Sequence, residues 1–391
     1  MSERIETIDA VRGFALAGIL VVNSLVFAST WYGTGLSTPD ASWLDIFLES
    51  VVSAVFELKF YLLFSFLFGY SITLQIQSAE RSGSNFIPRM LRRQAGLFVI
   101  GAIHAVVLFH GDILTTYAVL GLVLLALRNR TDRFLTVLAV MLIVVTGFLW
   151  VAIAVWQAGL PTHDETDIAR TIILAAAENW QGTPRQIITG HLTAIKDFLP
   201  LLVLLQAPTA LAMFLLGYVA GRHELFKNIK AVRQNWSGRI YVLGLLVGTP
   251  GALAYSLSTT FVPGTYIETL GLAVSIVTAP LLSATMVLGM IKLMSSPAAK
   301  NVQSLLAAAG RVALTNYLLQ SLLLAIVFHG YGLGLMNRLS IAQVLLIDGI
   351  IFFIQLLISR FWLSIFRYGP LEWMLRALTR LSFDLPKLNG Q

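Results

Sequence analysis

The chain of 391 residues contains no cysteine and few charged residues. Without cysteine it has no disulfide, no thiolate metal site and no cysteine nucleophile. Asp, Glu, Lys and Arg make up only 12% of the residues, about half the share in an average soluble domain. The sequence also lacks a P-loop, a dinucleotide-binding glycine motif, an HExxH helix and a nucleophile elbow. The enzyme classes that those motifs define are therefore excluded.

Hydrophobic residues, in contrast, make up 57% of the chain, and the mean hydropathy is +0.79. A helix needs about 20 apolar residues to cross about 30 Å of hydrocarbon. The apolar windows predict an all-α, polytopic transmembrane bundle of about ten spans. The expected spans are 11–29, 57–77, 93–110, 112–127, 134–157, 197–220, 240–260, 267–293, 306–329 and 341–363.

The basic residues alternate between the gaps that separate these spans. Of the 27 Lys and Arg residues, 22 lie in the N-terminal segment, in every second gap and in the tail. The other five are Lys59, Arg170, Arg185, Lys196 and Arg338. The positive-inside rule therefore predicts that both termini are cytoplasmic. It also explains the net charge of +7 better than nucleic-acid binding does.

Amphipathic segments outside the spans predict surface helices on a single membrane domain, 1–391. One covers Ser42 to Ala54. The outer loop at about 158–196 contains Thr183-Pro184, a typical helix start. The cytoplasmic interfacial tail, about 364–391, contains another start at Gly369-Pro370.

Ionisable residues at the ends of the first two spans are expensive in hydrocarbon, at about 2.5–3.5 kcal/mol each. Asp9 and Arg12 are three apart, so they share a helix face and are expected to pair. Either they anchor the helix, or Arg12 faces the bundle and holds an anion. Asn23 lies deeper on a similar face. Glu57 and Lys59 point in different directions, and Lys59 is expected to reach water by snorkelling.

The third span carries the strongest candidate. It begins at Arg92-Arg93, and His104 follows about 16 Å along the axis, near the midplane. Asp112 follows in the hairpin His110-Gly111-Asp112, which is expected at the outer surface and its mouth. A midspan histidine suits proton transfer or transient acyl attachment, although a histidine that ties two helices together is the alternative. His104 and His110 are six apart on opposed faces, so no metal site is expected.

The last two spans carry further polar residues. Asn316 and Gln320 share a face and are expected to tie helices together. Asp348 lies well inside the bilayer and needs a partner. Arg311 is not expected to be that partner, because it lies at the opposite end of its helix. Phe66-Leu67-Phe68-Gly69-Tyr70 and Phe214-Leu215-Leu216-Gly217-Tyr218 match each other, but five residues do not establish a duplication.

Together these segments resemble the YeiB-like bacterial membrane family, a domain of unknown function. The resemblance is carried by IETIDAVRGFALAGILVVN, FYLLFSFLFGYS, GAIHAVVLFHGDILTTYAVLG, GRVALTNYLLQS and RYGPLEWMLRALT, in that order. The opening D-x-x-R-G is also similar to that of transmembrane acyltransferases of the heparan-alpha-glucosaminide acetyltransferase type. This similarity maps Asp9, Arg12, Gly13 and Asn23 onto their opening motif. Their active histidine has no counterpart between Ser24 and Leu58, so His104 would have to replace it.

The resemblance implies a transmembrane acyltransferase in the bacterial inner membrane. Such an enzyme would move an acyl group from a cytosolic acyl-CoA-type donor to a cell-envelope acceptor, either a glycan or a lipid, without a metal. The residues expected to form an anion funnel are Arg12, Arg92, Arg93 and Arg311. His104 would be the base or acyl carrier, and Asp112 would orient the acceptor. The alternatives are a proton-coupled transporter of a small amphiphile and a non-catalytic scaffold; homodimer formation is left open.

Overall fold

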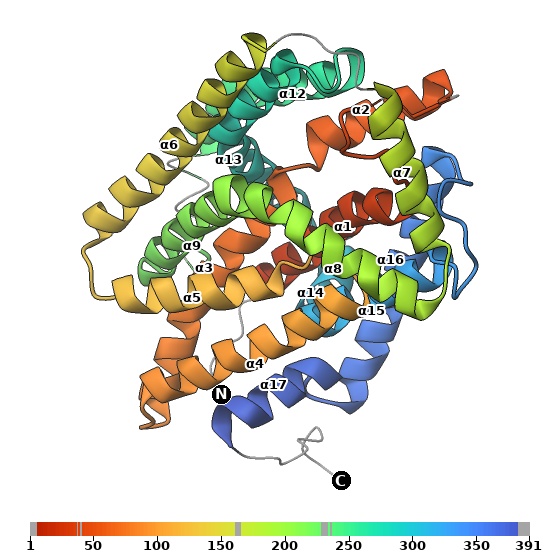
Figure 1. The fold of residues 1–391 in the computed structure, drawn as a ribbon. Coiled ribbons are helices and arrows are strands. Elements are labelled where there is room, and N and C mark those ends of the chain that lie inside the picture. The colour runs from red at the N-terminus through yellow and green to blue at the C-terminus, as the bar shows by residue number, and fades with distance from the viewer. Residues whose placement is uncertain are drawn as a thin grey trace.

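The computed structural model describes residues 6–36, 38–39, 41–160, 166–227, 234 and 237–381, and these residues fold into helices (Figure 1). The predicted all-α class is therefore confirmed. The helices of the first half are α1 (Glu6–Ala28), α2 (Trp43–Val55), α3 (Lys59–Arg81), α4 (Phe86–Val107), α5 (Leu114–Leu127), α6 (Asp132–Ala158), α7 (Thr166–Trp180) and α8 (Pro184–Leu201). Those of the second half are α9 (Ala207–Arg222), α11 (Ser237–Leu243), α12 (Thr249–Phe261), α13 (Tyr266–Met294), α14 (Lys300–Arg311), α15 (Ala313–Phe328), α16 (Ile341–Ile365) and α17 (Pro370–Arg380). Short π-helical segments join α8 to α9 and α11 to α12.

Eight of the described helical stretches are long and apolar enough to cross a membrane, or nine if one bent pair counts as a single span. That pair is the predicted ninth span, which breaks at Val312 and bends by 84° between its two halves. The predicted fourth span corresponds to α5, whose 14 residues rise only about 21 Å. The expected count of ten is therefore reached only if α5 and the bent pair both cross.

The surface helices begin where the sequence predicted. Ser42 caps α2 and Thr183 caps α8, each with a capping box, and Gly369 precedes α17. Trp43 and Phe47 expose 78% and 57% of their surface, as an interfacial helix requires. Arg4, residues 161–165 of the predicted outer loop and residues 382–391 of the predicted tail lie outside the described residues.

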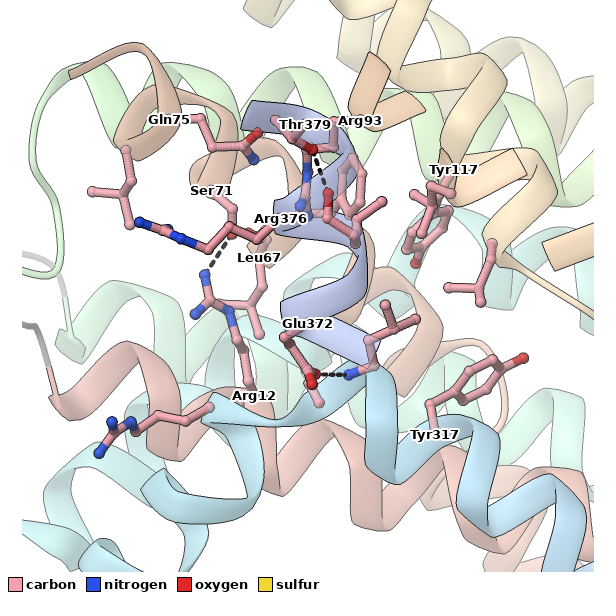
Figure 2. Close-up of a pocket in the computed structure, with 18 of the residues that line it drawn as sticks. Arg12, Leu67, Ser71, Gln75, Arg93, Tyr117, Tyr317, Glu372, Arg376 and Thr379 are labelled. Atoms are coloured by element: carbon pink, nitrogen blue, oxygen red, sulfur yellow. Dashed lines mark hydrogen bonds between the residues drawn. The ribbon is translucent and has the colours of Figure 1, made fainter. Parts of the chain in front are cut away.

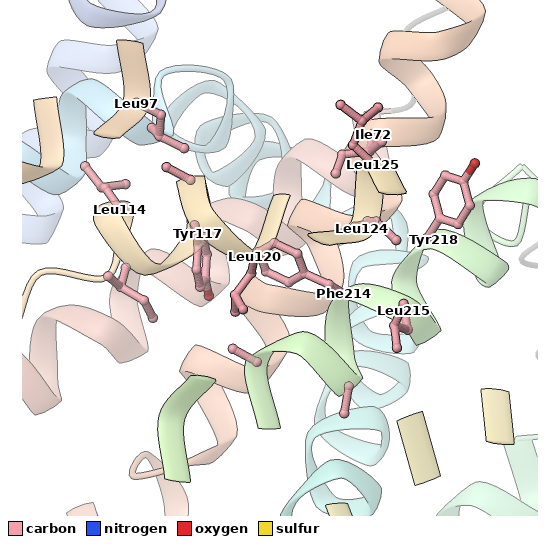
Figure 3. Packing of buried hydrophobic residues seen from close by; sticks show 14 of the residues in the cluster. Ile72, Leu97, Leu114, Tyr117, Leu120, Leu124, Leu125, Phe214, Leu215 and Tyr218 are labelled. Atoms are coloured by element: carbon pink, nitrogen blue, oxygen red, sulfur yellow. The ribbon is translucent and has the colours of Figure 1, made fainter. Parts of the chain in front are cut away.

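The two matching pentapeptides pack directly against each other where α3 crosses α9. A Cβ on Gly69 would lie 2.1 Å from the carbonyl oxygen of Phe214, and one on Gly217 would lie 2.0 Å from that of Phe66. Small residues let helix backbones approach this closely in membranes. Phe214 and Leu215 then join Leu120 and Leu124 of α5 in the main core (Figure 3).

The break between α2 and α3 corrects the expectation for Lys59. Leu58 has φ +63° and ψ −43°, and the Lys59 amide donates to the Glu57 carbonyl at 2.8 Å. This is the rare, strained form of the γ-turn. It turns Lys59 inward, where the side chain is 1% exposed and Nζ donates to the carbonyl of Ser53 at 3.0 Å. The snorkelling prediction is therefore wrong.

Candidate functional site

A cavity of about 460 Å³ lies among α1, α3, α4, α5, α14, α15 and α17. Figure 2 shows Arg12, Arg93 and Arg376 around this space, with Tyr117 and Tyr317 farther in. Glu372 is the only carboxylate among the described lining residues. The arginines that line the cavity are Arg12, Arg89, Arg93, Arg311, Arg376 and Arg380. Such an excess of guanidinium groups favours an anion, since their fixed forks match phosphate and carboxylate oxygens.

Arg12 is held in place from two sides. Its Nη1 donates to Asp9 at 2.7 Å, and its Nη2 donates to the hydroxyl of Ser71 at 2.5 Å. Asp9 is 3% exposed, so the predicted pair forms and fixes Arg12 at the wall of the cavity. On α4, Arg93 lies one turn from Arg89, and its Nε has no hydrogen-bond partner among the described residues.

Helix α17 closes one side of the cavity and explains the break in the ninth span. The Glu372 carboxylate accepts hydrogen bonds from the amides of Leu314 and Thr315, at 2.7 and 3.1 Å, and from the Thr315 hydroxyl at 2.6 Å. It therefore caps the start of α15. Burial raises the pKa of the Glu372 carboxyl, and the hydrogen bonds from Thr315 oppose that shift.

The structure brings three of the four residues predicted for the anion funnel to one cavity. Arg12, Arg93 and Arg311 line the cavity, but Arg92 does not. The Nε of Arg92 instead donates to the carbonyl of Thr379 at 3.1 Å, which fastens α4 to α17. The sequence analysis missed Arg89, Arg376 and Arg380. Their spacing was the available signal, because residues four apart share a helix face.

The part of the cavity away from the arginines is apolar. Its lining there comes from α1, α3, α4, α15 and the start of α5, and includes Ile19, Phe64, Phe68, Leu97, Ile113 and Leu114. Tyr117 and Tyr317 complete the wall, and both are almost fully buried. A charged rim with an apolar interior suits a ligand that has an anionic head and a hydrocarbon chain.

His104 and Asp112 form a buried pair beside this wall. The Nδ1 of His104 lies 2.8 Å from Oδ1 of Asp112, and the Thr115 amide donates to Oδ2 of Asp112 at 2.8 Å. An ionised carboxylate only accepts, so a neutral His104 must donate through Nδ1 and keep its lone pair on Nε2. The Nε2 atom is buried and has no hydrogen-bond partner in the described structure. Asp112 therefore orients His104. It is 3% exposed, so the prediction that it lies at the outer mouth and orients the acceptor there is wrong.

His104 does not line the cavity, so it does not open into the same hollow as Arg12. The ring of Tyr317 lines the cavity and also contacts His104, with its centroid 5.1 Å from that of His104. Because His104 is only 1% exposed, any reaction at Nε2 requires the packing around it to open.

The other polar residues tie helices together, as predicted. Asn316 donates to Ala309 and Ser359, and Gln320 donates to Gln355. Asp348 accepts from Ser24 at 2.6 Å, which links α16 to α1. Asn23 is half-buried on α1.

The apolar helices and the internal cavity define a polytopic helical membrane protein with an arginine-lined cavity inside the bundle. Residues 220–382 match the family model "Protein of unknown function (DUF418)". The chain is 30% identical to "Uncharacterized protein YxaH" of Bacillus subtilis (strain 168), over 98% of this chain and 96% of the relative. It is 26% identical to "Uncharacterized protein YeiB" of Escherichia coli (strain K12), over 96% of both chains. The chain therefore belongs to this YeiB-like family of unknown function; the similarity to acyltransferases stays a prediction.

Proposed function

We propose that this protein is a transmembrane acyltransferase that moves an acyl group from a cytosolic acyl-CoA-type donor to a cell-envelope acceptor. One observation carries the proposal. The His104–Asp112 pair, with Nε2 left open, lies one aromatic ring away from a cavity that has an arginine rim and an apolar interior.

The cavity supports donor binding. Its volume of about 460 Å³ falls within the usual range of about 300–1,000 Å³ for small-molecule sites. The phosphates of the donor would bind Arg93, Arg376 and their neighbours, since each guanidinium can hold two oxygens. The acyl chain would lie along Phe64, Phe68 and Leu97, which places the thioester near Tyr317.

The proposed reaction requires one proton transfer. Nε2 of His104 removes the proton from the acceptor hydroxyl as its oxygen attacks the thioester carbon. The new C–O bond forms, the C–S bond breaks, and the proton passes from His104 to the departing thiolate. Asp112 stabilises the imidazolium between these two steps, as a carboxylate does in other histidine-dependent acyl transfers. No oxidant or metal is required.

The orientation of the protein belongs to the same proposal. The α17 end of the bundle carries Arg89, Arg93, Arg376 and Arg380, and the positive-inside rule favours the cytoplasmic side of the bacterial inner membrane for such an end. The donor then enters beside α17, and the acceptor approaches from the envelope side.

The test separates binding from chemistry. Purified protein in detergent is titrated with a long-chain acyl-CoA by calorimetry, and acyl transfer to added envelope extract is followed by mass spectrometry. We expect Arg93→Gln to weaken binding about 10- to 100-fold, because a hydrogen bond to a charged group contributes about 1.5–3 kcal/mol. His104→Gln, which can still donate to Asp112, should bind normally and lose about 100-fold or more in transfer.

Arg133→Gln is the matched control, since Arg133 is exposed and does not line the cavity. Binding that is equal in Arg93→Gln and Arg133→Gln would refute the donor site. Acyl transfer that survives in His104→Gln would refute the catalytic role. Substrate-dependent proton flux without any acyl-CoA, in proteoliposomes, would favour the transporter alternative.

A further inference from the structure

Three histidines surround Trp180 at the end of the bundle away from α17. His110 lies between α4 and α5, His191 lies on α8, and His329 ends α15. The indole of Trp180 is stacked between the rings of His110 and His329, with centroids at 5.6 and 5.4 Å. The ring of His191 packs against its edge at 4.8 Å. We call His110, His191, His329 and Trp180 the histidine cluster.

The imidazoles of the cluster also contact one another. His191 lies 5.8 Å from His110 and 5.6 Å from His329, between ring centroids. His191 and His329 are 1% and 2% exposed. Within the described structure, Nδ1 of His110, both ring nitrogens of His191 and Nδ1 of His329 have no hydrogen-bond partner. Buried polar atoms without partners are rare, so the cluster is poised to take up protons or water.

The groups that face the cluster are almost all uncharged. Phe109 packs on His110, and Phe27 and Tyr331 pack on His329. The titratable neighbour of His191 outside the cluster is His104, which is paired with Asp112. No carboxylate of the described residues forms an ion pair with any of the three imidazoles, so no negative charge there compensates a positive one.

Protonation would therefore separate these rings. Burial lowers the pKa of both His110 and His329 from 6.5 to about 4. A charged imidazole can stack favourably on indole. However, each histidine of the cluster lies beside another, so a second proton would place like charges within one ring contact.

The cluster holds the hairpin formed by α7 and α8 against the rest of the bundle. The Gly330 amide donates to the carbonyl of Trp180 at 3.0 Å, and Gln181 Nε2 donates to the carbonyl of Phe328 at 3.3 Å. Beneath the cluster, Phe109 contacts both His110 and His104. Release of this hairpin would uncover the packing that covers the His104–Asp112 pair.

We propose that the histidine cluster is a pH-sensitive latch, in which proton uptake by His110, His191 and His329 releases the α7–α8 hairpin from the ends of α4 and α15. The latch would respond to the compartment on the side away from α17. It does not depend on the acyltransferase proposal, because it concerns opening and not the bound substrate.

Hydrogen–deuterium exchange of the full-length protein in nanodiscs tests the latch. Exchange is measured from pH 7.5 to 4.5, and the intrinsic effect of pH on exchange is corrected with an unfolded reference. Peptides covering 170–195 should exchange at least tenfold faster at pH 4.5 in the wild type. The triple variant His110→Gln, His191→Gln, His329→Gln should lose this pH dependence, because glutamine does not titrate in this range.

His223→Gln is the matched control, since His223 is exposed and bound to Asp132 at a different site; it should behave as the wild type. If the triple variant does not fold, His191→Gln alone should reduce the pH response at least threefold. The latch is refuted if exchange of 170–195 does not change with pH in the wild type. It is also refuted if acid accelerates exchange equally in the wild type and in the glutamine variants.

Discussion

The two ends of helices α4 and α15 differ in charge and in packing. At the α17 end, these helices line an arginine-rich cavity, and a carboxylate caps the start of α15. At the far end, the same helices lead to His110 and His329, whose rings stack on Trp180, and the buried His191 packs against the edge of that indole. One end is therefore built to attract an anion, and the other is built to exclude charge.

The His104–Asp112 pair contacts both ends through aromatic rings. The ring of His104 packs against Tyr317, which lines the cavity, and against Phe109, which packs on His110 of the histidine cluster. The two ends therefore differ in chemistry but share one neighbour, the His104–Asp112 pair.

The crossing of α3 and α9 supports the whole bundle, so disrupting it should destabilise both ends. Gly217→Val would force a side chain into the backbone of Phe66, where a Cβ has only 2.0 Å. We expect a loss of at least about 3 kcal/mol in the free energy of unfolding, the upper range for overpacking, measured by thermal unfolding in detergent. Gly349→Ala is the control, because nothing lies within 4 Å of its Cβ; it should be neutral or slightly stabilising.

A substitution in the His104–Asp112 pair should leave both ends of the bundle folded but impair acyl transfer. Asp112→Asn can no longer hold the proton on Nδ1 of His104, so we expect acyl transfer to fall about 100- to 10,000-fold. Binding of a long-chain acyl-CoA should not change, because Asp112 does not line the cavity. A parallel loss of binding would mean that the pair only supports the wall.

The two ends should respond to pH with opposite signs. The lowered pKa values of His110 and His329 mean that acid weakens the far end, since stability is lost as pH falls below about 6.5. The raised pKa of Glu372 means that the α17 end weakens as pH rises above the ordinary range of a carboxyl. Glu372→Gln should remove the pH dependence of exchange in α17 and leave that of residues 170–195 intact. If Glu372→Gln removed the pH dependence of exchange in both α17 and residues 170–195, the two ends would not be independent.

The smallest effect is expected at Arg92. It is the neighbour of Arg93, but Arg93 lines the cavity whereas Arg92 packs α4 against α17. Its Nε holds Thr379 and it does not face the cavity. Arg92→Gln should therefore lower the free energy of unfolding by about 1 kcal/mol and change acyl-CoA affinity less than threefold. A tenfold loss of affinity would place Arg92 in the funnel after all.

The sequence predicted the fold better than the site, and the reason is physical. Hydropathy and capping residues act locally, so the helix class and the starts at Ser42, Thr183 and Gly369 could be inferred from the chain. The pairing of Asp9 with Arg12 was also local. In contrast, the place of His104 behind Tyr317 depends on residues more than 200 positions apart. Likewise, Lys59 faces inward because Leu58 adopts a strained φ, which composition does not reveal.

The crossing of α3 and α9 has a mechanical consequence. Gly69 and Gly217 each rest on a carbonyl of the opposite helix, so a shift of one residue along either axis would bring a side chain against that oxygen. Sliding of α3 along α9 is therefore blocked at this contact, which holds the two helices in a single register.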